Sequence, residues 1–91
     1  MGNKEFEDLC ILELTKYINN KVDTLKGEDN FISFKDVYIV WICKILQNNK
    51  ALLSTNRKDG MYYELTYNGD KKELYIDAYK KEENKCIKIE N

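Results

Sequence analysis

The spacing of apolar positions divides the chain into a helical first half and a strand-rich second half. Between residues 4 and 20, apolar side chains recur every three or four positions, with Phe6, Cys10 and Leu14 on one stripe. This spacing predicts an amphipathic helix over residues 4–20. Glu5 and Asp8 lie near its start, where the helix dipole favours negative charge.

A second helix is predicted over residues 34–48. Ser33 and Asp36 have the spacing of a capping box at its start. The β-branched run over residues 37–40 would also suit a strand. The cap, the length of the segment and the polar pair Lys44 and Gln47 favour the helix, and Trp41 then lies on its buried stripe.

From residue 50 onward the apolar period changes from 3.6 to 2, which predicts an antiparallel sheet. The strands are expected over residues 50–56, 61–67 and 73–80, and a short fourth strand can follow over 86–89. Asn68-Gly69 is a strong hairpin signal, because both residues tolerate positive φ. A two-residue turn there pairs Tyr63 with Leu74, whereas a four-residue loop pairs Leu65 with Leu74.

The alternation along these strands assigns their side chains to two faces. The apolar set is Met61, Tyr63, Leu65, Tyr67, Leu74, Ile76 and Ala78, and the opposite set is Tyr62, Glu64, Thr66, Tyr75, Asp77 and Tyr79. We therefore predict a single α+β domain over residues 1–91. Its two N-terminal helices pack on one face of a three- to four-stranded antiparallel meander.

Composition argues against an enzyme. The chain has no His, and its 3 Cys are far apart, so the usual general base and zinc spacings are missing. It also lacks the glycine-rich phosphate-binding motifs, and no cofactor or metal is expected. A carboxylate-dependent nucleotide hydrolase using Glu64 and Asp77 is the alternative, although both residues suit a solvated strand face.

Charge and cysteine content indicate where such a protein works. The net charge of −1 gives no general attraction to nucleic acid or to anionic membranes, so a nucleic-acid partner is not expected. No apolar run is long enough to span a membrane, and no leader is recognised. The odd number of cysteines indicates free thiols in a reducing cytoplasm.

The second face of the predicted sheet is the candidate binding surface. Its tyrosine rings could stack on a base, cations could contact phosphate, and polar groups could bond to base or ribose. The residues assigned to this site are Tyr62, Tyr75, Tyr79, Asp77, Thr66, Arg57, Lys58, Lys44, Gln47 and Lys50. Tyrosine is also simply a good strand residue, and a tyrosine-rich face is common in protein interfaces and in self-association.

Several stretches of the chain resemble a family of small phage and prophage proteins from low-GC Gram-positive bacteria, known only as a domain of unknown function. The stretches are VWICKILQN (40–48), KALLST (50–55), DGMYYE (59–64), TYNGD (66–70) and DAYKK (77–81). The resemblance implies an accessory protein that acts by binding in the cytoplasm of an infected cell. The first expectation is a homo-oligomer that counters host defence by sequestering a nucleotide immune signal. The alternative is a protein–protein inhibitor of a host effector, a nuclease or a defence complex, that uses the same sheet face.

Overall fold

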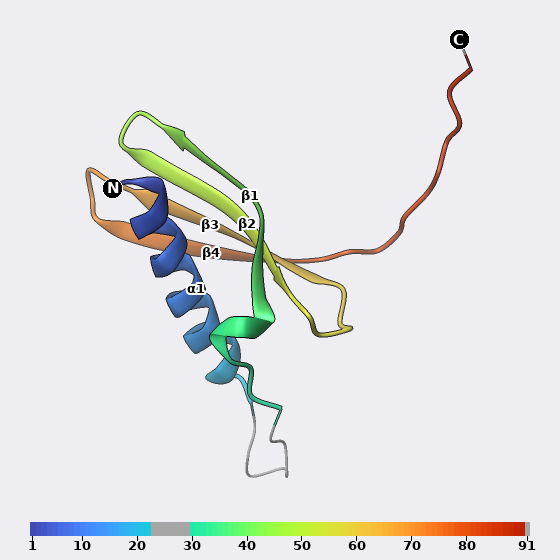
Figure 1. Cartoon of the computed structure of the whole chain (residues 1–91), viewed down its shortest axis with the longest axis horizontal. Helices are drawn as coiled ribbons and strands as arrows, with labels where there is room; N and C mark the ends of the chain where they lie inside the picture. The colour runs from blue at the N-terminus through green and yellow to red at the C-terminus, as the bar shows by residue number, and fades with distance from the viewer. Residues whose placement is uncertain (23–29, 91) are drawn as a thin grey trace.

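One helix packs against one face of a four-stranded antiparallel sheet in the computed structural model, which describes residues 1–22 and 30–90. Helix α1 (Asn3–Asn19) is followed by a short 3-10 turn, η2 (Phe34–Asp36), and by four strands in meander order. The strands are β1 (Val37–Ile45), β2 (Asn48–Thr55), β3 (Met61–Asn68) and β4 (Glu73–Lys80). Figure 1 shows α1 lying across the sheet and the segment after β4 leading away from it.

Helix α1 confirms the first predicted helix and its buried stripe. Phe6, Cys10 and Leu14 are fully buried, and they recur at helical spacing toward the sheet. Ala51 and Leu53 of β2, together with Leu65 of β3, meet this stripe in the core. The Tyr17 ring also packs edge-on against Tyr63, with centroids 6.2 Å apart. The helix is therefore held by burial of one stripe of its surface.

The predicted second helix is wrong, because residues 37–45 form the edge strand β1. The predicted cap is present but closes only the single turn η2: the backbone N–H of Ser33 donates to the Asp36 carboxylate at 2.8 Å. Beyond it, the β-branched residues prefer an extended backbone, and the strand pairs with β2 along its whole length. Leu46, with φ of 57°, and Gln47 form the two-residue turn into β2.

The hairpin between β3 and β4 confirms the predicted faces but neither predicted register. Tyr67 pairs with Leu74, and a four-residue connection separates Asn68 from its partner Glu73. The shift is an even number of residues from both predicted registers, so the apolar sets stay together. Gly69 in this connection lies so close to the Gln47 carbonyl that a Cβ atom would collide with it.

The predicted short strand over residues 86–89 is absent, since residues 81–90 have no regular secondary structure and are exposed. The residues just before α1 are hydrogen-bonded to the end of the sheet that carries the β1–β2 turn. Lys44 Nζ donates to the Met1 carbonyl oxygen at 3.0 Å, and Asn49 Nδ2 lies 3.4 Å from the same oxygen. These contacts fix the helix lengthwise above β1 and β2.

The buried stripe of α1 should dominate stability. We expect Leu14→Ala to lower the free energy of unfolding by about 2–5 kcal/mol, because it leaves a cavity against the sheet. Leu12 lies on the same helix but is 38% exposed, so Leu12→Ala should cost less than about 1 kcal/mol. Urea denaturation followed by far-UV circular dichroism measures both values. Equal losses for the two variants would contradict the packing of α1.

The cap at η2 should give a pH-dependent contribution. The Ser33 backbone N–H and the Asn56 amide both donate to Asp36, and they hold the pKa of its carboxyl below the usual range. Stability from this carboxylate is therefore complete above its unfolded pKa of about 3.9 and is lost as pH falls through the lower folded pKa. Asp36→Asn should lower the urea midpoint at pH 7, and the difference between the urea midpoints of the variant and the unmodified protein should be smaller at pH 3. A gap of the same size at both pH values would exclude this role.

Candidate functional site: the open face of the sheet

The face of the sheet opposite α1, which we call the open face, has no element of the described chain above it. It carries side chains from all four strands: Tyr38, Trp41, Cys43, Ile45, Lys50, Leu52, Ser54, Tyr62, Glu64, Thr66, Tyr75, Asp77 and Tyr79. The strand registers align these residues in rows across the sheet. One row joins Tyr38, Ser54, Tyr62 and Tyr79, and the next joins Trp41, Leu52, Glu64 and Asp77.

Strand β1 supplies a part of the open face that was not predicted from the sequence. Tyr38 is 49% exposed, Trp41 40% and Ile45 67%. Trp41 was predicted in the core because this segment was predicted to be a helix. The register shifts between Ile39 and Trp41, so the bulge at Val40 brings Trp41 onto the open face opposite Leu52. The β-branched run over residues 37–40 was the signal that could have revealed this strand.

The three predicted tyrosines all lie on the open face but not in one cluster. Tyr62 and Tyr79 are direct cross-strand partners, whereas Tyr75 pairs with Thr66. Tyr75 and Tyr79 are separated by Asp77 and lie about 13 Å apart along the strand. One aromatic base therefore cannot stack on all three rings.

The centre of the open face is acidic. Glu64 and Asp77 are direct cross-strand partners. Lys50 Nζ lies 3.3 Å from Glu64 Oε1 and offsets one of the two charges. Within the described ranges, no ion pair reaches Asp77. This centre favours a positively charged ligand group over a phosphate.

One end of the open face has a fixed hydroxyl. The Tyr75 hydroxyl donates to the Glu73 carboxylate, and this hydrogen bond raises the pKa of Tyr75 above its usual value. Tyr75 is nonetheless 47% exposed, so its ring remains available for contact. The bond fixes the ring orientation at the edge of the sheet.

Four of the predicted site residues do not lie on the open face. Arg57 and Lys58 lie in the loop between β2 and β3, and Arg57 donates to the Asn30 carbonyl. Lys44 is directed to the Met1 carbonyl on the helix side. Gln47 lies in the β1–β2 turn, where its amide donates to Asp70 at 3.1 Å. The cations expected to meet phosphate are therefore not gathered beside the tyrosines.

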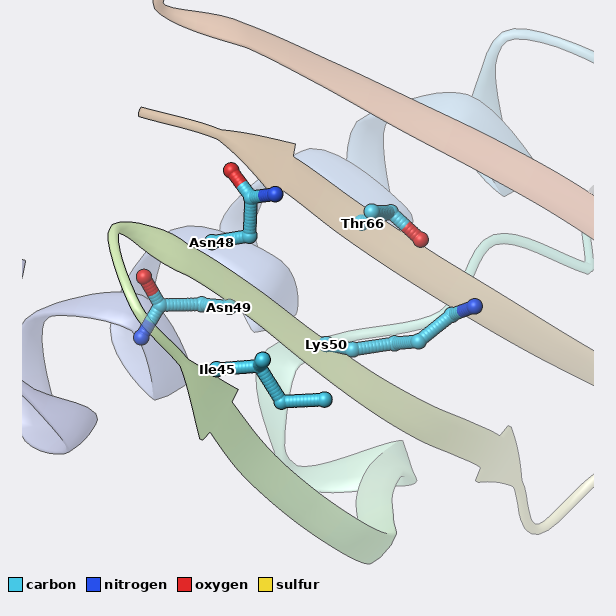
Figure 2. A pocket seen from close by; sticks show the side chains of 5 residues that line it. All are labelled: Ile45, Asn48, Asn49, Lys50 and Thr66. Carbon is cyan, nitrogen blue, oxygen red and sulfur yellow. The ribbon is translucent and has the colours of Figure 1, made fainter. Parts of the chain in front are cut away.

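A shallow pocket of about 210 Å³ lies where the β1–β2 hairpin meets β3. Its lining residues are Ile45, Asn48, Asn49, Lys50 and Thr66, shown in Figure 2. Lys50 and Thr66, two of the predicted ligand residues, extend in the same direction from neighbouring strands (Figure 2). Pockets that enclose small molecules are usually about 300–1,000 Å³, so this one would hold only part of a nucleotide.

The thiols and carboxylates give no second site. Cys10 is buried in the core, and burial raises its pKa to about 12, which keeps it a neutral thiol. Cys43 and Cys86 are exposed. Over residues 1–22 and 30–90, no three His, Cys, Asp or Glu side chains are arranged to hold a metal ion. Nor does this part of the chain contain a helix with the length and hydropathy to cross a membrane.

Comparison with known proteins places this arrangement in a family. A helix on a four-stranded meander with an open aromatic face is the architecture seen here, and residues 7–89 match the model of a family of unknown function (DUF6275). The chain belongs to this family. No curated protein and no solved structure shows significant similarity to it. The match covers α1 from Glu7 onward, all four strands and the extended segment after β4 as far as Ile89.

Proposed function

We propose that the protein is a binding module that docks the open face of its sheet on a partner protein and inhibits that partner stoichiometrically. This is the protein–protein inhibitor expected as the alternative from the sequence. The observation that carries the proposal is the aromatic and aliphatic surface of β1 and β4, left uncovered opposite α1.

The composition of the open face supports a protein partner. Trp41, Tyr38 and Ile45 on β1 are each at least 40% exposed, and Tyr75 and Tyr79 on β4 add two more exposed rings. Several large exposed apolar and aromatic side chains on one uncovered sheet face are typical of an interaction surface. Trp and Tyr also provide much of the binding energy at protein interfaces.

Charge specifies the chemistry of the partner. The Glu64–Asp77 pair lies between the aromatic ends of the face, and among the described residues only Lys50 forms an ion pair with it. A partner should therefore present a Lys or Arg side chain at the middle of an apolar surface. The positive group would meet Asp77, while the apolar groups would cover Trp41 and Tyr79. Charge complementarity of this kind favours specificity and the rate of association.

The biological setting of this proposal comes from the resemblance to phage and prophage proteins. A small protein that catalyses no reaction can inhibit a host nuclease or defence complex by binding it, provided that its concentration is at least that of its target. The proposed target is thus a host effector, and the proposed location is the cytoplasm of the infected cell.

Binding should depend on Trp41 and Asp77. With the full chain as bait in host lysate, the retained partner should be recovered at stoichiometric yield and then purified for affinity measurement. Trp41→Ala should weaken its affinity by about 30-fold, the size expected for an aromatic anchor of an interface. Asp77→Lys should also reduce the association rate, because it repels the basic partner.

The matched control for this experiment is Leu12→Ala, which truncates an exposed apolar side chain on α1, away from the open face. It should bind like the unmodified protein. A partner held equally well by Trp41→Ala and Asp77→Lys would show that the open face is not the docking surface.

A nucleotide signal is the second candidate ligand, and the pocket is the observation that favours it. Lys50 and Thr66 line the pocket, and Tyr75 is the cross-strand partner of Thr66. A phosphate could approach Lys50 while a base lies on Tyr75. Because the pocket is too small to enclose a whole nucleotide, a second protein surface would have to cover the rest of the ligand, as at a subunit interface.

Thermal denaturation with cyclic and linear nucleotides tests this candidate. A bound nucleotide at 100 times its dissociation constant should raise the Tm by about 10 °C or more. Lys50→Ala should remove most of that shift, and Lys58→Ala, in the β2–β3 loop, should leave it unchanged. No shift with any nucleotide would remove this candidate and leave the protein partner.

A further inference from the structure

The backbone of β4 has a free hydrogen-bonding edge. The N–H of Lys81 donates to the Gly60 carbonyl at 2.7 Å, which extends the β3–β4 pairing one residue beyond Met61 and Lys80. In an antiparallel ladder every second residue forms such a hydrogen-bonded pair. Because Lys81 is one of them, the odd-numbered residues of β4 point their backbone N–H and C=O groups toward β3. The even-numbered residues, Leu74, Ile76, Ala78 and Lys80, therefore point theirs outward.

The segment over residues 82–90 includes the alternating stretch 86–89, which suits a strand, and it pairs with no strand of the described residues. Its described residues make no backbone hydrogen bonds and are all exposed. Ile87 and Ile89 alternate with polar residues and are 68% and 79% exposed. The family match nevertheless continues through this segment to Ile89. It is thus part of the family's common sequence, although it contributes nothing to the core of one copy.

We propose that residues 82–90 form an added strand on the free edge of β4 in a second copy of this chain, and that the two copies exchange these segments reciprocally. The segment continues directly from β4 and leads away from its own sheet (Figure 1). A twofold axis near Lys81 therefore brings each segment onto the β4 edge of the other copy. Such an interface is self-complementary and closed.

The direction of the backbone groups limits the register. The backbone groups of even-numbered residues face the second copy in β4, and the same holds over residues 82–90 if the strand continues regularly. An even-numbered residue of one copy therefore lies opposite an even-numbered residue of the other. A pairing centred on Lys81 places Lys85 opposite Asp77, Ile87 opposite Tyr75 and Cys86 opposite Ile76.

The neighbouring allowed registers match less well. Centring one residue earlier places Glu83 opposite Asp77, which sets two like charges together. Centring one residue later places Ile87 opposite Asp77. The register centred on Lys81 places the two Lys81 side chains opposite each other, which is unfavourable. Glu83 of each segment lies diagonal to Lys81 of the other copy and offsets this repulsion.

The first test compares two substitutions at Cys86, whose N–H faces the partner strand in this register. Sedimentation equilibrium of the full chain should give twice the monomer mass of 10.8 kDa. Cys86→Pro removes that N–H from both copies and should raise the dimer dissociation constant about tenfold or more. Cys86→Ala keeps the N–H and should stay dimeric. Circular dichroism should show the same fold for both, since the segment lies outside the core.

The second test uses disulfide trapping to identify the partner and the register. In a Cys43→Ser, Cys86→Ser background, Asp77→Cys with Lys85→Cys places two thiols in a non-hydrogen-bonded pair, whose Cα separation of about 4.5 Å suits a disulfide. Mild oxidation should give a covalent dimer. The control, Asp77→Cys with Lys88→Cys, places the thiols on opposite faces and should not cross-link.

Three outcomes would overturn the proposal. A monomer at all concentrations would show that no exchange takes place. A disulfide formed within one chain would show that the segment folds back onto its own β4. A dimer that survives Cys86→Pro with unchanged affinity would show that another surface joins the copies.

Discussion

The contact between α1 and one face of the sheet is the interaction on which the rest of the structure depends. Phe6, Cys10 and Leu14 are fully buried against Ala51, Leu53 and Leu65. Each large apolar side chain in such a core stabilises the fold by about 1.5–3 kcal/mol. A four-stranded sheet without this cover would be marginal, so the helix determines which face becomes the core.

A single helix can cover only one face of a sheet, and this limit explains the surface of the protein. Trp41 and Tyr79 stay exposed because residues 1–22 and 30–90 form no second helix that could bury them. The β1 and β4 edges are also left without a third layer or a further strand in the described chain. Both features would favour aggregation unless they serve contacts. The acidic centre of the open face and the charged residues around the β4 edge make those contacts selective.

Sequence patterns predicted what local periodicity determines. The 3.6 period gave the position of α1, and the period of 2 gave β2–β4, with the correct faces for β3 and β4. They failed where local and long-range signals disagree: Ser33 and Asp36 do form a cap, but β1 is extended because its β-branched residues pair with β2, a partner that the sequence does not mark. The tyrosine face was predicted because alternation alone places it. Arg57 and Lys44 were misplaced because their partners, the Asn30 and Met1 carbonyls, are set by tertiary structure.

The dimer leaves the open face uncovered, although Lys85 of the second copy then lies beside Asp77 and offsets part of the charge that a basic partner would meet. The parity of β4 explains why the face stays uncovered. When even-numbered residues of two copies lie opposite each other, the twofold axis must run perpendicular to the sheet. Both helices then lie on one side and both open faces on the other, in a continuous sheet of eight strands plus two extensions. Ile87 of each copy would add to the open face of the other, next to Tyr75. The dimer would therefore present two identical binding faces side by side, and a partner with repeated sites would bind it more tightly than a monomer, without any new contact within a site.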